Sequence, residues 1–387
     1  MKNYEPLGKH IKLVDIRNTE SVTDNVLGIN IDKYFMPSVA NVIGTDLSKY
    51  KLLHKGLFAC NPMHVGRDKR LPVALYEDDS PAIVSPAYFM FDNIDPDVLN
   101  AEYLMMWFRR PEFDRLCWLK TDGSVRGGIT WDDLCRLEVP VIPYEEQLHI
   151  VKNYRVITDR IDLKRRINDN LLSQAQTYFS LFFSDKGIGK PLPKGWKVAK
   201  VGDYCVENVA NLSKADTFDT ILYLDTGSIK SNYIVELQEL NLLTDEIPSR
   251  AKRKVAHGDI IYSTVRPNLR HYGLLHNPPE NFIVSTGFAV LHNKGLEVTN
   301  EFLFMWLTTE SIIEYLQAVA ENSVSTYPSL NISDLMNVRI IVPDTEVLER
   351  ITHFLTSIFT AISENNRQIQ MLTRSLDTLL PRLLSSY

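Results

Sequence analysis

The sequence predicts an α+β protein in which two related globular modules are joined by two long helices that pair as an antiparallel coiled coil. The first observation is an internal repeat, because residues 82–89 and 282–289 carry apolar and small side chains in the same order. The second is a stretch of heptad-like spacing after each copy of the repeat. The third is a set of short runs rich in β-branched and aromatic residues between turn signals, which indicates strands. Two such modules predict a molecule with pseudo-twofold symmetry.

The repeat covers most of the chain. Residues 103–107 match 302–306, and both segments end in Met-Trp. Near the start of each copy, Gly8 matches Gly202. A repeat unit of this length is a duplicated domain rather than one unit of a solenoid.

A long helix is predicted after each copy, because apolar side chains recur every three or four positions from about residue 144 and again from about residue 344. Each helix has a single apolar stripe that needs a partner, and the other helix is the simplest one. The alternative is that each helix packs back on its own module. The expected seam contains Ile157, Ile161, Lys164, Asn168, Leu171, Leu355, Ile358, Ile362, Asn365, Ile369 and Leu372. Its polar members are expected to fix the register at some cost in stability.

These patterns predict the division of the chain and the main elements of each module. The expected parts are a first module at 1–143, a first helix at 144–184, a linker at 185–195, a second module at 196–343 and a second helix at 344–387. Strands are expected at 26–31, 221–224 and 259–263, and one amphipathic helix per module at 101–109 and 300–309.

The sequence lacks recognisable signatures of catalysis. Its one Gly-x-Gly, at residues 187–189, lies in the linker, where no strand leads into it as a nucleotide site requires. Residues 277–280 resemble the tetrapeptide with which amino-methyltransferases hold an adenine, but Glu280 stands where the stacking aromatic residue belongs. The four cysteines show no metal-ligand spacing. We therefore expect no catalytic residues, no metal and no cofactor, and an enzyme acting alone is disfavoured.

Charge and hydropathy narrow the class of protein further. A formal net charge of −6 argues against a protein that coats nucleic acid by bulk electrostatics, but it allows local basic patches. No apolar run approaches the roughly 18 residues that a membrane helix needs. We expect a cytoplasmic protein that does not contact membranes.

The two copies of the repeat differ in their loops, as expected when two modules perform one task on two different targets. Residues 61–70 and 264–271 are short loops rich in Arg, Asn and His. Arg can donate paired hydrogen bonds to guanine and Asn to adenine, so these loops are candidate base readers in a DNA major groove, although a solvated hairpin has a similar composition. The candidate contacts are His64, Arg67, Lys69, Arg70, Arg266, Asn268, Arg270 and His271.

A second divergent loop precedes the last strand of each module, and residues 250–254 hold the densest basic cluster. Small hydroxyl side chains and Arg suit close approach to a DNA backbone, and basic clusters suit phosphates. An ordinary turn and a solvated face would look similar. The additional candidate contacts are Ser124, Arg126, Lys252, Arg253, Ser325 and Tyr327.

Several motifs, taken in their order along the chain, resemble the specificity subunits of type I restriction-modification systems. They are the starts of the two long helices at 142–147 and 342–346, the Leu-Pro-Lys-Gly-Trp start of the second module at 192–196, and Gly-Asp-Ile-Ile at 258–261. The second helix has Val347 where the first has Gln147. The resemblance spans the whole chain.

The resemblance implies a non-catalytic subunit whose modules are target recognition domains, each reading one half of a bipartite site in double-stranded DNA. It implies that the paired helices set the spacer between the half-sites and dock two methyltransferase subunits. Adenine methylation and ATP-dependent cleavage would then belong to partners, which include restriction or translocase subunits where these are present. The alternative is a pseudo-symmetric scaffold that joins two proteins without reading DNA.

Overall fold

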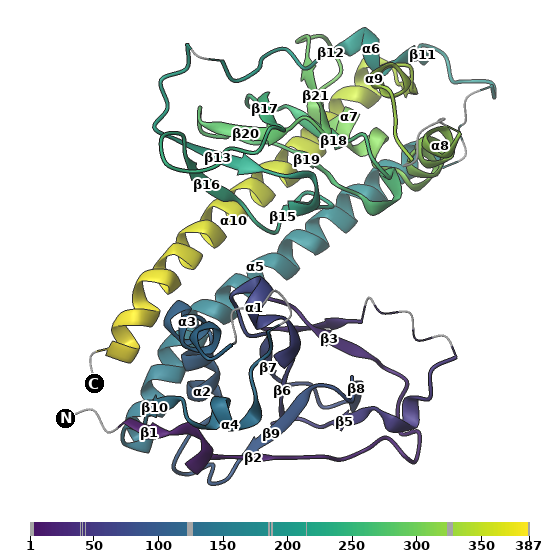
Figure 1. Cartoon of the computed structure of the whole chain (residues 1–387). Coiled ribbons are helices and arrows are strands. Elements are labelled where there is room, and N and C mark those ends of the chain that lie inside the picture. The colour runs from purple at the N-terminus through teal and green to yellow at the C-terminus, as the bar shows by residue number, and fades with distance from the viewer. Residues whose placement is uncertain are drawn as a thin grey trace. The chain divides into compact units, whose positions relative to one another are not determined.

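The computed structural model describes residues 4–38, 40, 42, 44–121, 127–184, 186, 189–213, 215–322 and 328–385. The chain forms two compact units, Met1–Leu163 with Ile369–Tyr387, and Lys164–Gln368. Each unit holds one globular module and part of each of the two long helices, α5 (Tyr144–Phe183) and α10 (Thr345–Ser385) (Figure 1). We call the part of the chain from β1 to β10 module 1 and the part from β11 to β22 module 2.

Module 1 is built on an antiparallel sheet with the strand order β2-β9-β6-β7. Smaller antiparallel pairs, β1–β10, β3–β4 and β5–β8, complete it. The strands are β1 Tyr4–Pro6, β2 Ile11–Leu13, β3 Leu27–Ile29, β4 Phe35–Pro37, β5 Lys51–Leu53, β6 Phe58–Cys60, β7 Val73–Leu75, β8 Ala82–Val84, β9 Phe89–Asn93 and β10 Glu138–Pro140. The helices are α1 Val65–Asp68, α2 Ala101–Phe108, α3 Pro111–Leu119 and α4 Trp131–Cys135, with 3-10 turns η1 Leu7–Lys9, η2 Leu47–Lys49 and η3 Pro62–His64.

Module 2 has a matching sheet with the order β12-β21-β18-β19 and a second sheet with the order β16-β13-β20-β17. Its strands are β11 Lys197–Lys200, β12 Cys205–Glu207, β13 Thr220–Leu224, β14 Ile229–Lys230, β15 Tyr233–Ile234, β16 Gln238–Asn241, β17 Ala251–Lys254, β18 Ile260–Ser263, β19 Tyr272–Leu274, β20 Phe282–Ser285, β21 Phe288–Asn293 and β22 Arg339–Val342. The helices are α6 Val201–Tyr204, α7 Asn300–Leu307, α8 Glu310–Glu321 and α9 Ile332–Met336, with 3-10 turns η4 Thr226–Ser228 and η5 Pro267–Leu269.

The two modules share one topology. The pair β1–β10 corresponds to β11–β22, the sheet β2-β9-β6-β7 to β12-β21-β18-β19, and the pair β5–β8 to β17–β20. Each module continues from its last strand into a long helix, α5 or α10. The predicted α+β class and the internal repeat are therefore confirmed.

The expectation of one amphipathic helix per module is wrong in two respects. Each module has two consecutive helices at this point, α2 with α3 and α7 with α8. In addition, α2 and α7 are buried on nearly all sides, because each lies between its sheet and the start of a long helix, within one continuous hydrophobic core. Pro111 resembles a helix stop in the sequence, but it occupies the first turn of α3, where proline is favoured.

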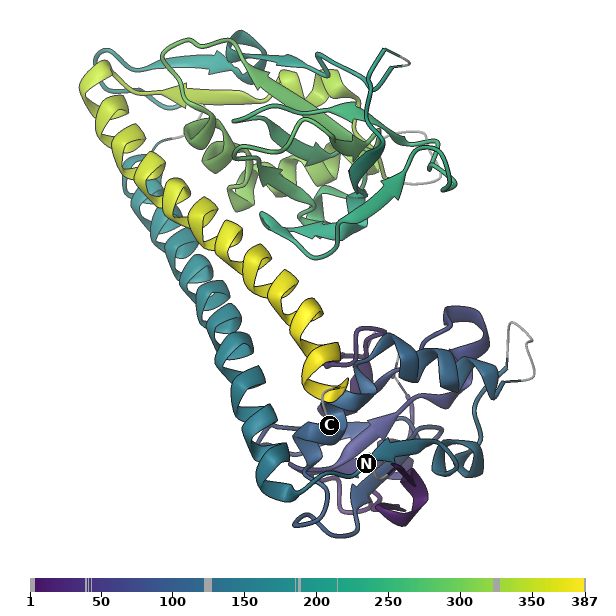
Figure 2. The ribbon, with the colours of Figure 1, turned by 90° about the vertical axis from the view of Figure 1, so that its left-hand side faces the viewer.

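Within the second unit, α5 and α10 pack side by side in opposite directions (Figure 2). Lys164 donates to Asn365 at 3.2 Å between Nζ and Oδ1, whereas the rings of Tyr178 and Phe354 lie 4.1 Å apart. Residue numbers thus rise along one helix as they fall along the other, which confirms the predicted antiparallel pair. Packing of α10 on its own module, the alternative, also occurs, since Phe359 contacts α7 at a ring distance of 5.5 Å.

Candidate nucleic-acid interface

The seam between α5 and α10 contains a small polar cluster in the second unit. Asn168 donates from Nδ2 to Asn366 Oδ1 at 2.8 Å and accepts from Asn365 Nδ2 at 2.8 Å. Lys164 also donates to Asn365. Hydrogen bonds between half-buried amides are directional, so this cluster specifies how the two helices are aligned. The other residues expected in the seam are buried or half-buried: Ile157, Ile161, Leu171, Leu355, Ile358, Ile362, Ile369 and Leu372.

Loop 1, residues 61–72 between β6 and β7, carries the basic residues expected to contact DNA in module 1. It folds into η3 followed by α1. Arg67 donates from Nε and Nη2 to the two oxygens of Asp68 at 2.6 and 2.9 Å, and this contact raises the pKa of the guanidinium. The Arg67 side chain is 55% exposed, so its charge remains accessible to a phosphate.

The other basic residues of loop 1 contact its surroundings. Arg70 donates from Nη1 to Asp32 Oδ1 at 2.9 Å. The Lys69 ammonium lies 5.4 Å from the centre of the Trp118 ring, within the range of a cation–π contact. The side chain of His64 lies outside the described part of the structure. These contacts fix loop 1 to α3 and to the β3–β4 hairpin.

Loop 2, residues 264–271 between β18 and β19, is the equivalent loop of module 2. It contains η5, and the residues on either side of that turn, Arg266 and Arg270, have left-handed backbone with φ of 48° and 58°. Residues other than glycine rarely adopt this conformation, so the surrounding contacts must hold it in place. Burial lowers the pKa of His271, the last residue of the loop.

Helix α8 supplies two of the contacts that hold loop 2. Arg270 donates from Nη2 to both carboxylate oxygens of Glu310, at 2.9 and 2.7 Å. The backbone N–H of Asn268 donates to Gln317 Oε1 at 3.1 Å. Asn268 and Arg270, both proposed base readers in the sequence, therefore face α8 with at least one polar group.

The flanks of the second divergent loop lie against loop 1 or loop 2 in each module. In module 1, Gly66 donates to the Gly127 carbonyl at 2.8 Å, and in module 2, Arg266 donates to the Pro328 carbonyl at 3.1 Å, both through backbone N–H groups. The structure thus brings these two regions of each module together. Four expected contacts lie outside the described residues: Ser124, Arg126, Ser325 and Tyr327.

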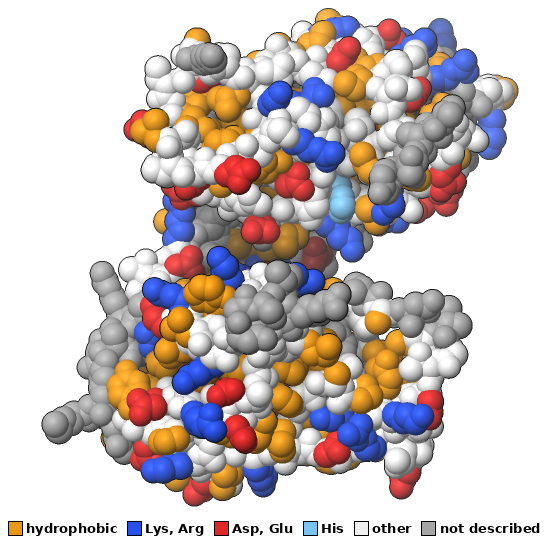
Figure 3. Space-filling view, viewed as in Figure 1, with side chains coloured by type: hydrophobic (Ala, Val, Ile, Leu, Met, Phe, Trp, Pro, Cys, Tyr) orange, Lys and Arg blue, Asp and Glu red, His pale blue; other side chains and the backbone are white. Residues whose placement is uncertain are grey.

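The basic cluster at 250–254 lies mostly on β17, and its members differ in environment. Lys254 donates to Asp216 at 2.5 Å. Arg253 is half-buried, its pKa is lowered by burial, and it donates to the Thr286 carbonyl at 3.4 Å. Lys252 is exposed, so it is the member of the cluster best placed to meet a phosphate. Figure 3 shows Lys, Arg and His side chains on one face of module 2.

The ends of β13 and β20 add a segment beside loop 2 that sequence reasoning missed. These strands are parallel, so their carboxyl ends meet at one edge, where residues 225–228 and 286–287 follow them. Thr264 donates to the Gly287 carbonyl from its backbone N–H at 2.9 Å and from Oγ1 at 3.1 Å. A Cβ on Gly287 would lie 2.7 Å from Thr226, so the glycine permits this close approach. The signal in the sequence was local divergence, because Thr-Gly replaces the Pro-Ala of the first copy inside a well-matched block.

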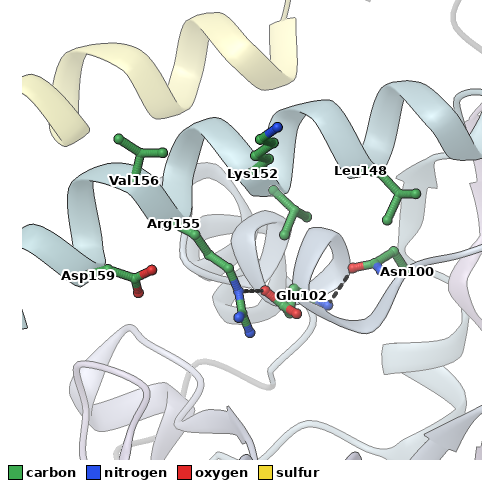
Figure 4. Close-up of a pocket in the computed structure, with 8 residues that line it drawn as sticks. Asn100, Glu102, Leu148, Lys152, Arg155, Val156 and Asp159 are labelled. Carbon is green, nitrogen blue, oxygen red and sulfur yellow. Dashed lines mark hydrogen bonds and ion pairs between the residues drawn. The ribbon is translucent and has the colours of Figure 1, made fainter.

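A shallow pocket of about 370 Å³ lies in the first unit between α5 and the start of α2 (Figure 4). Arg155 crosses it and pairs with Glu102, and it also contacts Glu77 at 3.3 Å. Leu148 and Val156 on the same helix are 37% and 53% exposed. Exposed apolar side chains among ion pairs are typical of a protein-binding surface rather than a small-molecule site.

The Pro-Tyr-Glu-Glu-Gln motif has a structural role at the start of α5. Gln147 is fully buried, its Oε1 accepts from the Asn100 N–H at 2.8 Å, and its Nε2 donates to the carbonyls of Val98 and Ile142, each at 2.8 Å. The glutamine therefore ties the helix start to the loop before α2. In module 2, where Val347 replaces it, Asp344 instead accepts from Trp196 Nε1 at 3.2 Å.

Thiol reactivity, metal binding and membrane insertion can also be judged from the described residues. Burial raises the pKa of the Cys205 thiol to about 12 and raises those of Cys60 and Cys117 as well, so these thiols stay protonated and weakly reactive. No group of three or more His, Cys, Asp or Glu side chains in the described part of the chain could hold a metal ion. None of the described helices combines the length and apolar character of a membrane span.

Residues 193–374 match the family described as the type I restriction modification DNA specificity domain. The chain is 27% identical over 177 residues to the specificity subunit of the type I restriction enzyme HindI from Haemophilus influenzae. It is 24% identical over 317 residues to the specificity subunit of the type I restriction enzyme MjaIX from Methanocaldococcus jannaschii. This chain is similar to type I specificity subunits, and its residues 193–374 match their DNA specificity domain.

The extent of each match differs. The Haemophilus match covers 46% of this chain and 38% of its relative, and the Methanocaldococcus match covers 76% and 71%. The crystal structure of the type I restriction-modification S subunit from M. genitalium aligns over 99% of this chain and 96% of that one, with 14% identity and a TM-score of 0.55. At this identity the structural match shows a shared fold. The resemblance to specificity subunits that the sequence motifs predict is therefore confirmed.

Proposed function

We propose that this chain is the non-catalytic, sequence-reading subunit of a type I restriction-modification complex, and that each module reads one half of a bipartite site in double-stranded DNA. The observation that carries the proposal is the presence of one framework in both modules with two different sets of loops. Modules 1 and 2 share their sheet topology, but loop 1 and loop 2 differ in length, sequence and fold. A shared scaffold with unlike loops suits one task performed on two unlike targets.

The proposed DNA-facing surface of each module consists of its first loop and the flanks of its second. In module 1 it includes Arg67, Lys69 and Arg70, and in module 2 it includes Arg266 and the exposed Lys252. Arg suits both guanine edges and phosphates, and we assign the exposed Lys252 to a phosphate contact. Ser124, Arg126, Ser325 and Tyr327 remain proposals from the sequence, as do His64, Arg253, Asn268, Arg270 and His271.

The long helices have two proposed roles. The polar cluster of Lys164, Asn168 and Asn365 supports a fixed alignment of α5 with α10, and a fixed alignment would set the spacer between the half-sites. The exposed apolar and charged groove beside Arg155 and Val156 is the proposed docking surface for a methyltransferase subunit. Methylation and ATP-dependent cleavage then reside in partner subunits, and we propose that the whole complex acts in the cytoplasm.

Mapping of methylated adenine in the host genome tests this function. Long-read sequencing with and without this gene should show an interrupted two-part motif that disappears on deletion. Exchange of residues 1–143 with those of a relative should then change one half of the motif and leave the other half and the spacer intact. A swap that alters both halves, or a deletion that leaves all methylation unchanged, would support the scaffold interpretation instead.

Single substitutions locate the contacts within one half-site. Arg266→Ala should weaken or relax recognition of the second half-site by roughly 1–3 kcal/mol if the guanidinium contacts a guanine edge. Lys252→Ala should weaken binding to all sequences about equally and reduce its salt dependence, because a phosphate contact carries no sequence information. Binding of purified complex to a panel of half-site variants at two salt concentrations distinguishes the two effects.

A further inference from the structure

The second helix of each module holds the backbone of the proposed recognition loop. In module 1, Asp114 on α3 accepts from the Leu71 N–H at 3.0 Å. In module 2, Gln317 on α8 accepts from the Asn268 N–H at 3.1 Å. Both helices thus act on the loop without being part of it.

Arg270 connects loop 2 to two neighbouring elements. Its Nη2 donates to the two oxygens of Glu310, at 2.9 and 2.7 Å, so this nitrogen is already engaged on α8. Its carbonyl accepts from the Ser231 N–H at 2.8 Å, in the turn between β14 and β15, and its own N–H donates to the Pro267 carbonyl at 2.9 Å. The side chain and the backbone of one residue therefore both fix the turn.

The groove around this ion pair is acidic. It measures about 230 Å³, and its lining includes Glu310, Glu314 and Glu321 along one face of α8. Three carboxylates repel DNA phosphates at close range, so this side of loop 2 is a poor place for a DNA backbone to approach. A guanidinium directed here stabilises the loop more readily than it reads a base.

We propose that Arg270 and Glu310 form a positioning pair that sets the conformation of loop 2 and, through it, the base preference of the second half-site. Neither side chain contacts DNA in this role. The inference rests on the proposed function. It assigns different roles to two residues of loop 2, because Arg266 remains a base reader whereas Arg270 becomes a positioning residue. Positioning depends on opposite charges at the two sites and is independent of which site carries which charge.

Charge exchange within the assembled complex tests the pair. The variants are Arg270→Glu, Glu310→Arg and the double variant, and the readout is discrimination between the cognate second half-site and its single-base variants. Each single variant should reduce discrimination about 10-fold or more, while the first half-site is read as before. The double variant should return to within about 3-fold of the unsubstituted protein.

A matched control comes from the same face of α8. Glu314 also lines the groove, but no ion pair joins it to the described residues of loop 2, so Glu314→Arg should leave discrimination unchanged. If the double variant is as defective as Arg270→Glu, then Arg270 reads a base directly and the positioning role is wrong. If the unsubstituted complex methylates no bipartite motif, the proposed function itself has failed, which is a separate outcome.

Discussion

Loop 1 in module 1 is held by a buried ion pair, whereas loop 2 in module 2 is held by an exposed one. In module 1, Lys33 donates to Asp114 at 2.6 Å, and the two residues are 4% and 7% exposed. In module 2, the Arg270 and Glu310 side chains are 40% and 61% exposed. The pair on α3 thus belongs to the core of module 1, whereas the pair on α8 lies at the surface of module 2.

Burial decides what each pair contributes. A buried charge that loses its partner leaves an uncompensated ion in a medium of low dielectric, whereas an exposed charge is resolvated at little cost. In module 1 the same carboxylate also accepts the Leu71 N–H, and Lys33 lies 5.0 Å from the centre of the Phe113 ring. Loop 1 is therefore coupled to the folding of its module, whereas loss of the Arg270–Glu310 pair should cost module 2 little stability.

The largest predicted effect tests this difference directly. Asp114→Ala should destabilise module 1 by about 3–5 kcal/mol, because it leaves Lys33 buried without its partner. Glu310→Ala should destabilise module 2 by less than about 1 kcal/mol, because its pair is solvated. Amide hydrogen exchange in the full-length chain, followed separately for core residues of each module, measures both effects in one preparation.

A double variant separates the charge effect from packing. Lys33→Met with Asp114→Leu removes both charges and keeps apolar volume, so it should recover much of the stability lost in Asp114→Ala. It will not recover all of it, since the Leu71 N–H loses its acceptor. Equal losses for Asp114→Ala and Glu310→Ala would show that the two modules hold their loops in the same way after all.

The next effect concerns two glycines at equivalent positions of the repeat. A Cβ on Gly8 would lie 2.8 Å from the Cys135 Cβ, whereas a Cβ on Gly202 would lie 3.2 Å from the Met336 carbonyl oxygen. Gly8→Ala should therefore lower the free energy of unfolding by about 1–3 kcal/mol through overpacking, and Gly202→Ala should lower it by less than about 1 kcal/mol.

The control for the glycine pair is Gly28→Ala in β3. Its Cβ would meet nothing closer than 3.9 Å, so it should be neutral or slightly stabilising. Thermal unfolding of the three variants gives the ranking. If Gly202→Ala is the most damaging, contact distance at the glycine does not control tolerance at this position of the repeat.

The sequence predicted the framework of this protein better than its sites. Periodicity and the repeat sufficed for the α+β modules and the antiparallel helices, because each depends on patterns that recur over tens of residues. Lys33–Asp114 was missed, since its partners lie 81 positions apart and neither stands out locally. The strand-end segment at 286–287 was missed because a parallel strand pair creates it, and strand pairing is not visible in the sequence.

The assignment of Arg270 shows a related limit. An Arg-rich loop predicts base contacts by composition, but composition does not reveal that Glu310, 40 positions later, engages one of its guanidinium nitrogens. Residue type indicates which chemistry is available, and only the fold shows which partner uses it. Composition therefore marks candidate loops, but it does not show which contacts their residues make within the fold.

The smallest predicted effect is a pH dependence confined to module 2. Burial lowers the pKa of His271 and of His276 below the ordinary value of 6.5. Below about pH 6.5 the unfolded chain therefore binds more protons at these two histidines than the folded chain does. The stability of module 2 should fall as the pH drops from about 6.5 through the folded-state pKa values. Hydrogen exchange at pH 7.5 and 5.5 should show the loss in module 2.

Substitution of both histidines identifies the source of that loss. His271→Asn with His276→Gln should flatten the pH dependence of module 2, since neither amide titrates. Asp259, which lies 2.8 Å from His292, offers no alternative explanation, because burial raises its pKa. A carboxyl with a raised pKa takes up its proton more readily in the folded state, so it favours folding as the pH falls and opposes the predicted trend. A persistent loss in the double variant would therefore contradict the burial argument for these histidines.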